Sequence, residues 1–132
     1  MPFAVVQATF WDHGGSAFTP VPQPTWEAIA GELTRKRSAS LAGSVGTAFG
    51  TMTLQRHAAG WLVVARPTDG AKALWLTDPA RAKAPAALGC CGSAKLPGVY
   101  IIADAPATAA ARHFYDTGAC SPDLTWSETP PG

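Results

Sequence analysis

Apolar residues gather in short runs that proline and glycine interrupt, and the spacing within each run predicts its secondary structure. Phe3 to Trp11 is rich in Val, Phe, Thr and Trp with small residues between them, which predicts a strand covered on at least one face. From Thr25, a good N-cap, apolar residues that include Trp26 recur at helical spacing as far as Leu33. The chain is therefore expected to open with a strand and a helix docked on a sheet.

The segments on either side of that helix are expected to be irregular. Thr19 to Pro24 carries a proline at every second position, so its backbone is held extended and cannot act as a donor within a central sheet. We expect a stiff connector there. Arg35-Lys36-Arg37 falls in the last turn of the predicted helix, where cations interact favourably with the carbonyl end of the helix dipole. Ser38 to Gly50 is small and Gly-rich, which predicts a flexible loop leading into a strand.

The middle of the chain changes to short β segments joined by turn residues. The Asp-Gly pair at positions 69 and 70 supplies the positive backbone dihedral that a tight turn needs. An antiparallel meander is therefore predicted, followed by a loop-like stretch rich in proline and glycine. The expected strands are Phe49 to Arg56, Trp61 to Arg66 and Ala71 to Thr77, and the loop-like stretch is Ala80 to Gly98.

The last quarter predicts a closing strand, helix and plug. Val99 to Ala103 is a compact, largely β-branched run that leads into an Ala-rich helix from Asp104 to Tyr115, with Asp104 as its N-cap. Gly118 can take the left-handed conformation that ends a helix, and Leu124-Thr125-Trp126 follows as an apolar plug. The whole order predicts an α+β fold, an antiparallel β-meander sheet with two helices packed on one face, and a single domain over residues 1–132.

Composition narrows the class of protein. With 132 residues, 47% of them hydrophobic and 14% charged, the chain can bury a core without a disulfide or metal. Its net charge of +1 gives no electrostatic reason to propose a nucleic-acid or membrane surface. The N-terminus lacks a signal-peptide pattern, and the three cysteines Cys90, Cys91 and Cys120 cannot all pair within one chain, so we expect reduced thiols and a cytoplasmic location.

Histidine and cysteine supply the atoms for metal binding or catalysis without the accompanying motifs. His13, His57 and His113 with the cysteines lack the Cys-x-x-Cys spacing typical of metal sites, so neither a metal nor a cofactor is expected. A Cys, His and Asp set is also present, yet no nucleophile motif accompanies it. Catalytic residues are therefore not expected.

The five tryptophans are many for a chain of this size, and some are candidates for partner binding. Core packing explains most of them, but tryptophan is also enriched in binding hot spots, so those near turns with acidic neighbours are favoured. Arg81, in the turn region after Trp75 and Asp78, is added as a charged residue expected at the surface. The candidate partner-binding residues are Trp11, Asp12, Asp69, Trp75, Asp78 and Arg81.

The stretch from Ala109 to Gly118, with the residues after it, resembles the closing signature of a family of bacterial immunity proteins. That family protects against polymorphic and contact-dependent toxins, many of them deaminases, and ends in an Ala-containing helix, a Phe, a Thr-Gly stop and a Leu-x-Trp plug. Phe114, Thr117-Gly118 and Leu124-Thr125-Trp126 stand at the matching positions. The resemblance implies a non-enzymatic inhibitor without a cofactor that binds one cognate toxin domain and blocks substrate access to its active site.

Two other functions remain open at this point. A small enzyme or ligand-binding domain could use one of the cysteines with a histidine, and an adaptor in a secretion apparatus would also be a small interaction module. Replacing the cysteines by serine separates the first alternative from a toxin inhibitor, because only thiol chemistry depends on them.

Overall fold

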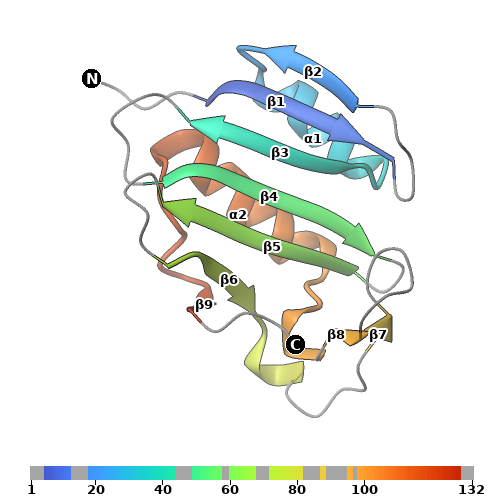
Figure 1. The fold of residues 1–132 in the computed structure, drawn as a ribbon, viewed down its shortest axis with the longest axis vertical. Helices are drawn as coiled ribbons and strands as arrows, with labels where there is room; N and C mark the ends of the chain where they lie inside the picture. Colours follow the sequence, from blue (N-terminus) through green and yellow to red (C-terminus); the bar gives the residue numbers. More distant parts are fainter. Residues whose placement is uncertain are drawn as a thin grey trace.

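The protein, as a computed structural model, is described over residues 5–12, 18–43, 49–57, 60–67, 72–81, 87–88, 95–96 and 98–128. Figure 1 shows its ribbon, in which strands dominate. The elements are β1 Val5–Trp11, β2 Phe18–Pro22, α1 Trp26–Thr34, β3 Ser38–Gly43, β4 Phe49–His57, β5 Gly60–Pro67, β6 Leu74–Thr77, the 3-10 turn η1 Pro79–Arg81, β7 Ala87–Leu88, β8 Lys95–Leu96, the 3-10 turn η3 Gly98–Tyr100, α2 Asp104–Thr117 and β9 Thr125–Ser127.

Seven of the strands form one antiparallel sheet in the order β2-β1-β3-β4-β5-β6-β9. The run from β3 to β6 is a meander, α1 connects the edge strand β2 to β3, and β9 returns from α2 to pair with β6 at the other edge. Both helices lie behind the sheet in Figure 1, on the same face. The predicted α+β fold, with a meander and two helices on one face, is confirmed.

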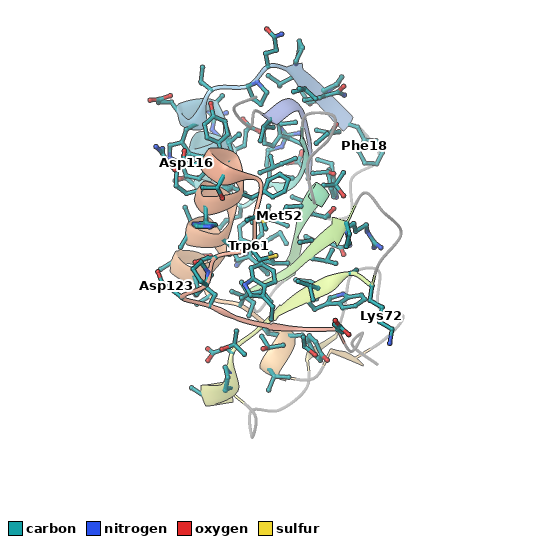
Figure 2. The ribbon with its side chains drawn as sticks, turned by 90° about the vertical axis from the view of Figure 1, so that its left-hand side faces the viewer. Phe18, Met52, Trp61, Lys72, Asp116 and Asp123 are labelled. Carbon is teal, nitrogen blue, oxygen red and sulfur yellow. The ribbon has the colours of Figure 1, made fainter. Side chains whose placement is uncertain are left out.

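The core lies between the helices and the sheet. Successive side chains of a strand point to opposite faces, so every second residue of the central strands points toward α1 and α2. Figure 2 shows Met52 of β4 and Trp61 of β5 between the sheet and the helices. The largest fully buried side chains are Phe10, Ile29, Leu41, Met52, Leu54, Val63, Leu76, Ile101, Ile102 and Phe114.

The two helices begin and end largely as the sequence predicts. Thr25 caps α1, because its side chain accepts a hydrogen bond of 3.2 Å from the backbone N–H of Ala28. Gly118 ends α2 in the left-handed conformation at φ 73°, and its N–H donates to the carbonyl of Phe114 at 2.8 Å. The predicted N-cap of α2 is wrong, because the cap is Ala103 and Asp104 is the first helical residue.

Trp26 packs the two helices together. Its ring lies 5.8 Å from that of Tyr115 and 5.1 Å from the guanidinium of Arg112, both on α2. The Tyr115 hydroxyl donates to the carbonyl of Pro24 at 3.2 Å. These contacts fix the start of α1 against the second half of α2, in agreement with the predicted core role of Trp26.

The proline-rich connector is an edge strand, β2, which pairs with β1 from Phe18 to Pro22. The N–H of Gln23 donates to the carbonyl of Val6 at 2.9 Å, so by the alternation of an antiparallel ladder the nitrogens of Pro20 and Pro22 face away from β1. Those positions need no donor toward β1. The prolines are therefore compatible with an edge position and not with a central one.

The predicted flexible loop from Ser38 to Gly50 is wrong over its first half, which forms β3 at the centre of the sheet. Ala39 and Leu41 are fully buried, and the small residues let α1 lie close over the strand. Pairing with β1 and β4 on both sides outweighs the low strand propensity of this segment. Residues 44–48 lie outside the described residues.

The predicted buried strand from Val99 to Ala103 is also wrong, although Tyr100, Ile101 and Ile102 are buried. Gly98–Tyr100 is a 3-10 turn, and Ile102 makes a single bridge in which it exchanges hydrogen bonds of 2.8 and 2.9 Å with Trp61. β6 pairs with β5 only at Val64 and Ala65, so the backbone of Trp61 in β5 is free of β6. Ile102, from the segment before α2, pairs with Trp61 there.

The basic run Arg35-Lys36-Arg37 lies just after α1 and not in its last turn, because the helix ends at Thr34. Its cations make ion pairs between elements. Lys36 pairs with Asp104 at the start of α2, and Arg37 pairs with Glu32 and with Asp12 at the end of β1. The run therefore links the C-terminal end of α1 to the start of α2 and to the residue after β1.

Asp104 is the centre of a polar cluster that joins α2, β4 and β5 to the turn after α1. Its carboxylate pairs with Lys36, accepts a hydrogen bond of 2.8 Å from Trp61 Nε1 and pairs with Arg56 at 3.1 Å. The Arg56 guanidinium lies 5.3 Å from the centre of the Trp61 ring. Hydrogen bonds from Lys36 and then Trp61 lower the pKa of Asp104 below its usual value of 3.8.

Asp104→Asn is expected to lower the free energy of unfolding at neutral pH by about 1 kcal/mol. The substitution removes charge-assisted hydrogen bonds at a helix N-terminus, and the loss is small because solvent screens this exposed cluster. A lowered carboxyl pKa stabilises the fold above the unfolded-state pKa and loses that contribution as the pH falls through the folded-state value. Denaturant titrations at pH 7 and pH 3 should therefore show a smaller difference between variant and wild type at pH 3. An equal difference at both pH values would contradict a role for the ionised carboxylate.

Candidate partner-binding surfaces

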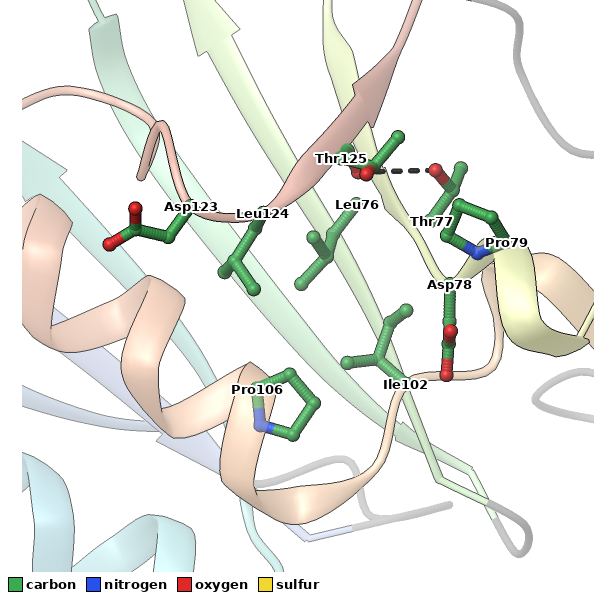
Figure 3. Close-up of a pocket in the computed structure, with 9 residues that line it drawn as sticks. All are labelled: Leu76, Thr77, Asp78, Pro79, Ile102, Pro106, Asp123, Leu124 and Thr125. Atoms are coloured by element: carbon green, nitrogen blue, oxygen red, sulfur yellow. Dashed lines mark hydrogen bonds between the residues drawn. The ribbon is translucent and has the colours of Figure 1, made fainter.

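A cavity of about 250 Å³ opens between the end of β6, the start of α2 and the segment before β9 (Figure 3). It contains Asp78, one of the residues that the sequence singles out. It also contains two residues of the C-terminal plug. The described lining residues are Leu76, Thr77, Asp78, Pro79, Ile102, Pro106, Asp123, Leu124 and Thr125.

The plug segment shapes one wall of this cavity. Trp126 lies opposite Leu76 in the β6–β9 ladder and packs partly buried against the core. Its indole N–H donates to the carbonyl of Ser121 at 3.0 Å, and the N–H of Leu124 donates to the same carbonyl at 3.3 Å. The turn before β9 is thereby fixed, and it presents Asp123 and Leu124 beside the cavity (Figure 3).

The cavity combines an apolar floor with two carboxylates. Leu76 and Ile102 are almost fully buried, and Leu124 and Pro106 are partly accessible above them. Asp78 is held in place because its Oδ1 accepts a hydrogen bond of 3.1 Å from the N–H of Ala80. None of the described lining residues carries a positive charge, so the cavity suits an amphipathic cation better than an anion.

Trp75 lies on the opposite face of the sheet from the cavity. It pairs with Val64 on one side and Ser127 on the other, while Leu76, the next residue, points to the helix side. No helix in the described ranges covers the face that carries Trp75 (Figure 1). The surface around this edge of the sheet is named the β6–β9 end, and it consists of Trp75, Asp78, Asp123 and Leu124.

Trp11 and Asp12 lie at the other edge. Trp11 pairs with Phe18 across the β1–β2 ladder with a ring separation of 5.6 Å, and Phe18 is 61% exposed. We name these two residues the aromatic corner. Asp12 accepts a hydrogen bond of 3.0 Å from Arg37, so its carboxylate joins the end of β1 to the segment after α1.

The predicted partner-binding residues therefore do not form one patch. β1 and β6 are separated by β3, β4 and β5, which at about 4.8 Å per ladder step places Trp11 and Trp75 about 19 Å apart across the sheet. Asp69 lies outside the described residues, and for Arg81 the structure gives the backbone of η1 only.

Sequence reasoning missed Asp123 and the exposed Phe18. Asp123 stands directly before Leu124-Thr125-Trp126, so the turn that precedes a plug could have indicated an accessible carboxylate. Phe18 adjoins a proline-rich segment, where an aromatic side chain beside a stiff strand could have been suspected of being exposed.

The described residues give little support to thiol chemistry. Burial raises the pKa of the Cys120 thiol to about 11, which leaves little of the nucleophilic thiolate at neutral pH. Cys90, Cys91 and His13 lie outside the described residues, and only the backbone of His57 is described. Within the described part of the chain, no group of three His, Cys, Asp or Glu residues could hold a metal ion.

None of the helices in the described ranges is both long enough and apolar enough to cross a membrane. In three comparisons, the chain matches no protein-family model, no curated protein and no solved structure. Its function is therefore inferred from the surfaces themselves.

Proposed function

We propose that this chain is an immunity protein that binds a cognate bacterial toxin domain in the cytoplasm and covers the entrance to its active site. Deaminase toxins are the class that the C-terminal resemblance favours. The observation that carries the proposal is a convergence at one cavity. Asp78, a partner-binding residue predicted from the sequence, lines it together with Leu124 and Thr125, which belong to the segment that resembles the immunity family.

The β6–β9 end has the composition expected of a binding surface. A stable complex needs about 800 Å² from each partner, which is about a tenth of the 7067 Å² surface of this chain. The cavity, in which Leu124 is an apolar anchor, is too small by itself, but Trp75 on the opposite face of the sheet adds an aromatic anchor. Asp78 and Asp123 supply polar groups around these anchors.

The proposal is tested by co-expressing the chain with the toxin domain encoded beside its gene. We expect a stable one-to-one complex in size-exclusion chromatography, loss of toxin activity in the purified complex, and survival of cells that express the toxin. A chain that forms no complex with this domain and gives no protection would overturn the proposal.

The cysteine-dependent alternative is tested in the same assay. Replacing Cys90, Cys91 and Cys120 together by serine should leave protection intact, because an inhibitor that acts by covering a site uses no thiolate. Thermal denaturation of the triple variant serves as the folding control. If the variant folds normally and protection disappears, thiol chemistry is required and the inhibitor proposal fails.

A further inference from the structure

We propose that the cavity at the β6–β9 end receives an arginine side chain of the protein partner. This inference rests on the proposed function, since it assumes that the partner is a protein. It adds the chemical identity of the group that the cavity recognises.

The size of the cavity favours a single side chain. Pockets for drug-sized molecules usually enclose about 300–1,000 Å³, whereas this one encloses about 250 Å³ and opens at the surface between β6, α2 and the turn before β9. An aliphatic stem of three methylenes can lie on the partly accessible Leu124 and Pro106, above the buried Leu76 and Ile102, where contact with apolar side chains replaces contact with water.

The charges of the cavity suit the end of that stem. Figure 3 shows Asp78 and Asp123 on opposite sides of the apolar residues Leu76, Leu124 and Ile102, with the Asp123 carboxylate directed away from them. Asp78 uses Oδ1 for the N–H of Ala80, and a carboxylate has capacity for further donors. Asp123 is exposed and can turn toward a ligand.

The attraction for a cation is local. The net charge of the whole chain is +1, so long-range steering does not favour a positive partner. The carboxylate of Asp104, two residues before Pro106 in the chain, is not among the described lining residues and is already paired with Lys36 and Arg56, so it does not compete for the incoming charge.

A guanidinium fits better than an ammonium for two physical reasons. It is more weakly hydrated, so it loses less on entering a partly apolar cavity, and its planar fork donates to carboxylates in two directions. Arginine is also enriched at the centres of protein interfaces, whereas lysine is depleted there.

The test uses N-acetyl-L-arginine methylamide as a probe and the methyl resonances of the full chain as the readout. We expect saturable shifts confined to Leu76, Ile102 and Leu124, with a dissociation constant of about 10 mM, as is reasonable for one side chain without its protein. The citrulline analogue, which has the same shape without the charge, and the lysine analogue serve as matched controls. Both should bind at least about threefold more weakly.

Carboxylate variants complete the test. Asp123→Asn, at an exposed position, should weaken probe binding about threefold, and the Asp78→Asn, Asp123→Asn double variant about tenfold. Absence of probe shifts at these methyl groups, equal binding of the citrulline analogue, or unchanged binding in Asp123→Asn would overturn the inference.

The toxin complex separates this inference from the proposed function. If the double variant binds the toxin domain as tightly as wild type, the arginine site is wrong and the immunity function stands. If the probe binds as expected but no toxin complex forms, the immunity function is wrong and the assignment to a partner arginine falls with it.

Discussion

A Gly60→Ala variant should lose about 3 kcal/mol of unfolding free energy, because an added methyl group has no room where β5 begins. A Cβ at this position would lie 2.7 Å from the carbonyl oxygen of Ile102 and 2.8 Å from Cγ2 of Ile101. The same Ile102 exchanges two backbone hydrogen bonds with Trp61, so the segment cannot move away without breaking them. Chemical denaturation measures the loss, and the midpoint of thermal unfolding should fall by about 10 °C.

Gly31→Ala is the matched control for this change. Gly31 lies inside α1 with no heavy atom within 4 Å of an added Cβ, so the substitution removes unfolded-chain entropy without a clash. It should raise the stability by about 0.5–1 kcal/mol. A Gly60→Ala variant as stable as wild type would show that the approach of Ile102 to β5 is looser than the structure indicates.

Leu124→Arg should weaken the complex with the cognate toxin domain at least about 100-fold, equivalent to about 2.7 kcal/mol. The introduced side chain can fill the cavity from within its own chain and place a guanidinium beside Asp78 and Asp123, so that the partner finds the site occupied and positively charged. Leu124 is only partly buried, so most of the core packing is retained. Titration calorimetry with the purified toxin domain measures the effect, and circular dichroism checks the fold.

Phe18→Arg provides the matched control, since it introduces the same charge at the aromatic corner on the far edge of the sheet. It should change the affinity less than about threefold. If Leu124→Arg binds as wild type does, the β6–β9 end is not the interface. If Phe18→Arg alone abolishes binding, the aromatic corner makes the contact instead.

The sequence predicts best where a local signal decides the structure. Thr25 and Gly118 act through hydrogen bonds to residues within one helical turn, so both helix ends can be read from the chain. The strand β3 could not be predicted in this way, because its small residues become a strand only when β1 and β4 pair with it. Asp104 is a residue type typical of an N-cap, which is why the sequence predicts that role. Its carboxylate instead binds Lys36 and Trp61, which are distant in sequence.

The candidate site follows the same division. Asp78 could be proposed as an acidic neighbour of Trp75 close to a turn, which is a local pattern. The cavity needs three segments that are distant in sequence, around Leu76, Pro106 and Leu124, and no local pattern indicates that they meet. The exposure of Phe18 depends in the same way on the absence of a described element over β2.

The two prolines of β2 also disfavour strand pairing between this edge and a second copy of the protein. Their nitrogens point outward from the sheet and carry no hydrogen, so a strand of another molecule that paired with β2 would lack two successive backbone hydrogen-bond donors. Fibre growth and accidental joining of sheets are disfavoured along that border even when the protein is concentrated. A partner that approaches there must be held by side chains, with Phe18 the most prominent of them.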